Sequence, residues 1–122
     1  MQPPGVFNLT SGPDGDRRIV EGSDNRFTLA FDSTYGSDWS GYAARAELRD
    51  TYKSAGGTLI GSFVATITNP GPSARTIHFH LPYTVTIPVG TNCGVWDCEI
   101  YNGVSVVRVV QGEWEVNLEA TT

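Results

Sequence analysis

The chain has 122 residues and a mass of 13.2 kDa, and its 13 acidic against 8 basic side chains give a formal net charge of −5. A chain of this length buries one hydrophobic core, so we expect a single globular domain. No apolar run approaches the roughly 18 residues of a membrane span, and the net acidity with scattered basic residues argues against a nucleic-acid-binding surface.

The N-terminal segment differs from the rest of the chain. Residues 1–25 hold three of the seven prolines and show little apolar periodicity. The sequence therefore predicts an extended arm over residues 1–25 and a folded domain over residues 26–122. We expect Val6, Phe7 and Leu9 to anchor this arm on a neighbouring subunit, and a frayed terminus is the alternative.

From residue 26 onward, apolar and polar side chains alternate with period two, as in half-buried β-strands. Turn signals every 8 to 12 residues predict an all-β fold of about seven or eight strands. The predicted strands cover Arg26–Asp32, Tyr42–Asp50, Thr58–Thr68, Thr76–Leu81, Tyr83–Val89 (an edge strand or a crossover), Val95–Tyr101, Val104–Gln111 and Glu113–Glu119. The predicted core residues are Phe27, Leu29, Ala44, Ala46, Leu48, Phe63, Ile77, Phe79, Trp96 and Ile100.

Glycines suggest three local features. Gly61 predicts a β-bulge within its strand. Asn102 and Gly103 predict a hairpin with a type I′ turn, because both residues tolerate positive φ. Gly112 interrupts an apolar run, and we expect it at a bend or bulge between two strands.

Two histidines and two cysteines are the candidate metal ligands. His78 and His80 share one strand face, and Cys93 and Cys98 are five residues apart. A zinc site or a disulfide is conceivable, but the spacing is poor. We favour a core thiol at Cys98 with solvated histidines, and we expect no metal and no cofactor.

The acidic residues favour a solvated surface over a catalytic pair. Glu47, Glu113 and Glu115 fall on the polar faces of predicted strands, where charges discourage edge-to-edge pairing. Asp14 and Asp16 flank a glycine without the bidentate acid of a calcium loop. No set of nucleophile and base is recognisable, so we expect a protein that is not an enzyme.

Tyr35 and Trp39 lie in a loop outside the strand alternation. They are either contact residues for a sugar or a protein, or, for Trp39, a lid over the end of the core.

Several motifs in their order resemble small immunoglobulin-like domains of tailed bacteriophages, such as the N-terminal domain of baseplate upper proteins and of short tail or fibre-attachment proteins. Trp96 and Cys98 replace the tyrosine and leucine usual in that family, and both keep an apolar face. The matching motifs are Ile19-x-x-Gly22-x-x-x-x-Phe27, Trp39-Ser40-Gly41-Tyr42-x-Ala44-Arg45-x-Glu47-Leu48-Arg49, Trp96-Asp97-Cys98-Glu99-Ile100, and Val107-x-Val109-x-Gln111-Gly112-x-Trp114-x-Val116.

This resemblance implies an immunoglobulin-like antiparallel β-sandwich and a structural role in a virion assembled in the host cytoplasm. The implied function is a tail or baseplate adaptor that links or anchors tail fibres or other tail components. Its implied partners are other virion proteins and further copies of itself, as a trimer or hexamer. A capsid decoration or head-fibre protein is one alternative, and a carbohydrate-binding module using Tyr35 and Trp39 is the other. With no receptor-binding module expected after Thr122 and no signal peptide at Met1–Gly5, we expect a free-standing domain.

Overall fold

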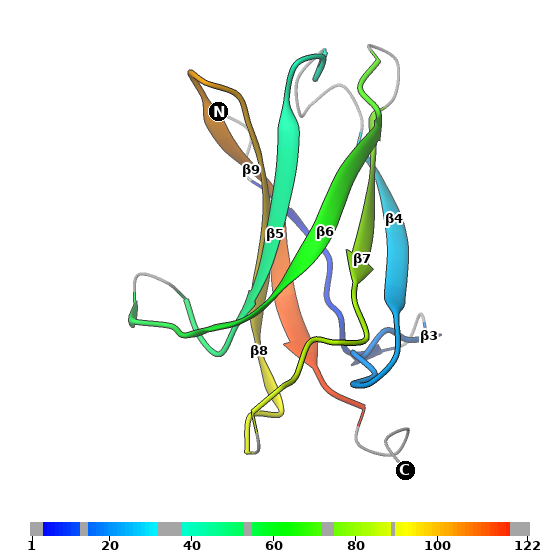
Figure 1. Ribbon diagram of the computed structural model, residues 1–122, viewed down its shortest axis with the longest axis vertical. Coiled ribbons are helices and arrows are strands. Elements are labelled where there is room, and N and C mark those ends of the chain that lie inside the picture. The colour runs from blue at the N-terminus through cyan, green and yellow to red at the C-terminus, as the bar shows by residue number, and fades with distance from the viewer. Residues whose placement is uncertain are drawn as a thin grey trace.

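The computed structural model describes residues 4–12, 15–31, 38–52, 55–71, 75–88 and 90–117, and within them every named element is a β-strand (Figure 1). The all-β prediction is therefore confirmed. No helix in this described part of the chain is long and apolar enough to cross a membrane. The strands are β1 (Gly5–Val6), β2 (Ser11–Gly12), β3 (Gly15–Asp16), β4 (Asn25–Phe31), β5 (Ala43–Arg49), β6 (Leu59–Asn69), β7 (Arg75–Leu81), β8 (Cys93–Tyr101) and β9 (Val106–Glu115).

Seven strands form one curled mixed sheet in the order β1-β9-β8-β5-β6-β7-β4, and β2 and β3 form a separate small hairpin. The curl is centred on β6, which changes partner along its length. Its residues 59–63 pair with β5, and its residues 64–69 pair with β7. The sheet thus folds over itself and encloses a core between its two halves (Figure 1). The predicted all-β architecture thus takes the form of a single curled mixed sheet of seven strands.

The topology contains a Greek key. Strands β5, β6 and β7 follow one another as antiparallel neighbours, and the preceding strand β4 lies beside β7. Long connections from β4 to β5 and from β7 to β8 carry the chain between the two halves of the sheet. The predicted segment Tyr83–Val89 is part of the second connection. Its residues 83–88 form a crossover and not an edge strand, which confirms one of the two predicted alternatives, and Val89 lies outside the described residues.

Aromatic rings from both halves of the sheet meet at the centre of the core. The ring of Phe27 stacks on Phe79 with centroids 4.8 Å apart, and Trp96 meets Phe79 edge-on at 5.6 Å. Phe63 lies 5.8 Å from Trp96. Offset and edge-to-face contacts of this kind are the favoured arrangements of aromatic rings. Seven of the ten predicted core residues are buried, and the other three are half-buried and pack against the core: Phe27, Leu29 and Ala44.

The N-terminal segment lies along β9 of its own chain. Residues 5 and 6 pair in parallel with residues 110 and 111, and isolated bridges join Leu9 to Trp114 and Ile19 to Val116. Backbone hydrogen bonds continue this contact on both sides of the β2–β3 hairpin. Leu9 and Ile19 are each 2% exposed, so this stretch supplies core residues that a freely extended arm would not.

The bend or bulge expected at Gly112 is not there. β9 runs through Gly112 without interruption, and Gly112 lies opposite Trp96 in the register with β8. A Cβ atom at Gly112 would overlap the backbone carbonyl of Phe7. The glycine is needed because the N-terminal segment approaches β9 closely at this point. The bulge in this hairpin lies instead at Val109 of β9, which the register skips between the pairs Cys98–Val110 and Glu99–Arg108.

The hairpin between β8 and β9 is confirmed, but its type I′ turn is wrong. Neither Asn102 nor Gly103 has a positive φ. The loop has four residues, and the Asn102 side chain closes it by accepting hydrogen bonds from the amides of Val104 (2.8 Å) and Ser105 (2.7 Å). The bulge predicted near Gly61 is confirmed, because the β5–β6 register skips one residue, Ile60, beside it.

Candidate interaction surfaces

The three predicted anchor residues of the arm occupy different environments. Leu9 is buried, and Phe7 is half-buried with its ring stacked on Phe27 at 5.6 Å. The indole nitrogen of Trp96 donates a hydrogen bond to the Phe7 carbonyl at 2.7 Å. Val6 is 72% exposed. Of the three, only Val6 has an exposed side chain.

Trp39 is part of the core, as the lid interpretation expects. Its side chain is 2% exposed, its ring lies 5.2 Å from Phe31, and its amide donates to the carbonyl of Pro70 at 3.0 Å. The guanidinium of Arg75, which is itself buried, lies 5.8 Å from the Trp39 ring. A buried indole offers no open face to a sugar, and Tyr35 lies outside the described residues.

The predicted motif around Gly41 forms the entry to β5. The amide of Tyr42 donates to the Trp39 carbonyl at 3.0 Å, and Gly41 takes a φ of +83° in the turn between them. This left-handed conformation favours glycine. Tyr42 and Ala44 are half-buried against the core. These residues position β5, and nothing in their geometry marks a binding site.

Trp114, in the last of the matching motifs, is fully buried, and its indole nitrogen donates to the carbonyl of Arg49 at 2.9 Å. Together with Trp96 it ties β9 and the N-terminal segment to the centre of the sheet. The role of both tryptophans is therefore cohesion of the fold.

The two histidines and the two cysteines do not come together in a common site. His78 and His80 lie on β7, where His78 shares a hydrogen bond with Thr28 and His80 contacts Asp24 at 2.9 Å. Cys98 lies in the core on β8, and burial raises the pKa of its thiol to about 12. Cys93 is exposed at the start of the same strand. Both thiols are free, so the disulfide alternative is wrong, and no metal-binding cluster occurs among the described residues.

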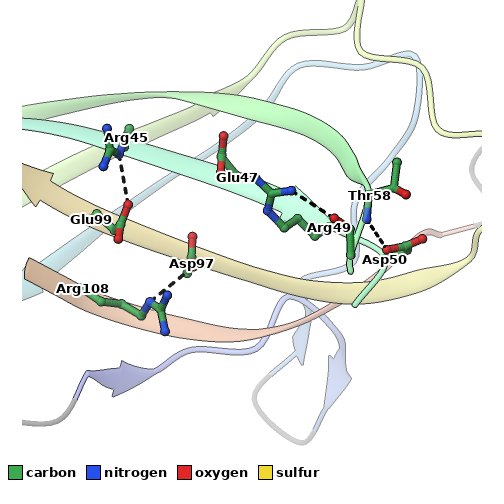
Figure 2. Close-up of polar contacts among 9 residues, drawn as sticks. Arg45, Glu47, Arg49, Asp50, Thr58, Asp97, Glu99 and Arg108 are labelled. Atoms are coloured by element: carbon green, nitrogen blue, oxygen red, sulfur yellow. Dashed lines mark hydrogen bonds and ion pairs between the residues drawn. The ribbon is translucent and has the colours of Figure 1, made fainter. Parts of the chain in front are cut away.

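A ladder of charged side chains covers the outer face of β5, β8 and β9 (Figure 2). Arg45 of β5 contacts Glu99 of the neighbouring strand β8 at 3.0 Å, Arg49 contacts Glu47 of the same strand at 2.9 Å, and Arg108 contacts Asp97 at 3.3 Å. Arg45 also lies 4.8 Å above the ring of Tyr101. Three acids and three arginines thus compensate one another on this face, which favours a solvated surface over a site for a charged ligand.

Asp97 is the perturbed member of this charged ladder. Partial burial raises the pKa of its carboxyl above the ordinary value of 3.8, and the neighbouring carboxylates of Glu99 and Glu47 act in the same direction. Arg108 opposes the shift without cancelling it. Glu47 lies directly opposite Asp97 in the β5–β8 register, so its carboxylate adds to burial, which is the largest cause of the raised pKa.

The open margin of the sheet is the feature that the sequence did not reveal. β4 stands last in the sheet order and pairs only with β7 among the described strands (Figure 1). Between it and the N-terminal segment runs a groove of about 370 Å³, with Phe7, Leu9, Ile19 and Phe27 among its lining residues. The alternation of residues 26–32 predicts a strand, but edge position depends on contacts distant in the sequence, and no local signal encodes it.

Arginines and aspartates rim this groove. Arg18 donates two hydrogen bonds to the carboxylate of Asp16 and holds its pKa at about 2. A hydrogen bond with the His80 side chain lowers the pKa of Asp24, and a second hydrogen bond, from the amide of Tyr83, adds a smaller effect in the same direction. The two acids are thus occupied by partners within the same chain.

A comparison with protein-family models finds no match for this chain, and a comparison with curated proteins finds none either.

Proposed function

We propose that the protein is a non-enzymatic structural protein of a bacteriophage virion, an adaptor that links tail or baseplate components. The proposal takes the phage context from the motif resemblance, with its immunoglobulin-like architecture. The geometry contributes one supporting observation, the unpaired margin of β4. Open sheet edges accept strands of other chains, and this mode of association suits a small assembly protein.

The polar side chains support a cohesive role. The histidines bond to Thr28 and Asp24, and the acids of the charged ladder bond to arginines of the same face. All but the Arg49–Glu47 pair, which lies within β5, join neighbouring strands or turns. Such an arrangement is typical of a rigid module whose surface is presented to other proteins.

Quantitative mass spectrometry of purified particles tests this function. The particles would come from the culture whose genome encodes the chain, and the tail proteins of known symmetry would serve as internal standards. An adaptor is expected at a fixed copy number that is a multiple of three or six. Absence of the chain from washed particles would contradict the proposal.

Gold labelling of an affinity tag on intact particles then locates the protein. Label at the tail or baseplate supports an adaptor, whereas label distributed over the head would assign the decoration role instead. A glycan array with the wild-type protein tests the sugar-binding alternative, for which the buried Trp39 offers no stacking surface.

A further inference from the structure

The strand β4 has the properties of an edge that is built to be paired. Its seven residues pair with β7 in an uninterrupted register, with no bulge, and its sequence contains neither proline nor glycine. Arg26 is its only charged residue. Natural edge strands are usually protected by shortness, bulges, proline or several charges. The opposite edge, β1, has that protection, since it is only two residues long.

The inward-facing side chains of β4 are incompletely buried. Phe27 and Leu29 point inward like their partners Phe79 and Ile77 on β7. The two β7 residues are fully buried, whereas Phe27 and Leu29 are only half-buried. The difference arises because β4 pairs with β7 alone among the described strands. One more strand would remove this apolar surface from water.

We propose that the missing neighbour is β4 of a second copy of this chain, paired antiparallel about a two-fold axis at Thr28. The register that pairs all seven residues places Thr28 opposite itself. It sets Phe27 opposite Leu29 on the inner face and Arg26 opposite Ala30 on the outer face. No like charges then face each other directly, and apolar residues meet apolar residues.

The symmetry has a consequence for assembly. A two-fold interface uses the same patch on both subunits and closes after two copies. It accommodates a hexamer built from three such pairs, but by itself it cannot build a trimer. The inference rests on the proposed function, because it supplies the contact through which copies of an adaptor would assemble.

Two substitutions of opposite charge at Ala30 test the proposed register between the two copies of β4. Ala30 is exposed on the outer face, and the proposed pairing brings it opposite Arg26 of the second copy twice in each dimer. Ala30→Glu is therefore expected to tighten the dimer by about threefold to tenfold in sedimentation equilibrium, and Ala30→Lys to weaken it by a similar factor. Equal effects of the two variants, or monomers in all three proteins at the highest concentration, would overturn the inference.

Disulfide trapping tests the axis independently. Thr28→Cys, in a Cys93→Ser background, places two thiols opposite each other across the axis, and mild oxidation is expected to give a covalent dimer. Thr66→Cys on β6 is the matched control, since Thr66 is exposed in the same row of the sheet but two strands away from the edge. Equal cross-linking of the two variants, or none in either, would contradict the axis.

The two proposals fail in different ways. Failure of both the charge pair and the trapping refutes the β4 interface even if the chain is present in particles. Absence from particles refutes the adaptor role even if β4 pairs in solution.

Discussion

Gly112→Ala tests the close approach of the N-terminal segment to β9. The added methyl group would lie 2.8 Å from the carbonyl carbon of Phe7 and 2.9 Å from Oδ1 of Asn8, and closer still to the Phe7 oxygen. Both residues are fixed there: Phe7 donates its amide to Gln111 at 3.0 Å, and Asn8 accepts from the amide of Glu113 at 3.0 Å. The methyl group can be accommodated only if this contact opens.

The magnitude follows from two terms. Overpacking a closely packed contact costs about 1–3 kcal/mol, and loss of one or two backbone hydrogen bonds adds about 1 kcal/mol each. We therefore expect Gly112→Ala to lower the free energy of unfolding by about 2–5 kcal/mol. Denaturant unfolding followed by tryptophan fluorescence measures this directly, because Trp96 bonds to the Phe7 carbonyl beside the site.

Gly103→Ala is the matched control. Gly103 lies in the β8–β9 loop with no neighbouring atom within 4 Å of an added Cβ, and its φ is not positive. Its substitution is expected to change stability by less than about 0.5 kcal/mol. If the two variants were equally stable, the N-terminal segment would not cross β9 at Gly112, and the reasoning would be refuted.

Three further predictions follow from burial and charge. Leu9→Ala should destabilise the protein by about 2–5 kcal/mol through the cavity it leaves. Val6→Ala, at an exposed position, should have almost no effect in the same unfolding assay. Similar losses of unfolding free energy in the two variants would contradict the docking of the N-terminal segment on β9. Trp39→Ala should lower the free energy of unfolding by about 3–5 kcal/mol and leave retention on immobilised glycans unchanged. A selective loss of glycan binding would instead support a sugar-contact role for Trp39. Asp97→Asn should raise the melting temperature at pH 7, because the raised pKa of Asp97 means that its charged form costs stability above the ordinary value of 3.8. That gain should disappear as the pH falls below 3.8, and a melting temperature lowered at pH 7 would contradict it.

Local pattern accounts for most of the strands. The alternation in residues 42–50 and 76–81 predicts β5 and β7 to within a residue or two, because one face of each strand is buried and period two follows directly. The inward row of Ile77, Phe79 and Leu81 is buried as expected. Such alternation depends only on neighbouring residues, so the strands that it marks can be predicted from the sequence.

Features that depend on distant contacts were missed. Leu9 and Ile19 lie in a segment rich in turn residues, and nothing near them in the sequence indicates that residues of β9 and just beyond it, 105 and 97 positions away, pair with them. Gly112 looks like a strand break for the same reason, since the backbone that excludes a side chain there comes from Phe7. The open edge at β4 likewise follows from sheet order and from no residue of β4 itself.

Hydrogen–deuterium exchange resolved along β4, at low and at high protein concentration, tests the central claim most directly. If copies of the chain pair through this edge, exchange over Asn25–Phe31 should slow as concentration rises, while exchange over the interior strands β7 and β8 should stay the same. Exchange over β4 that is fast and independent of concentration up to the solubility limit would contradict the account.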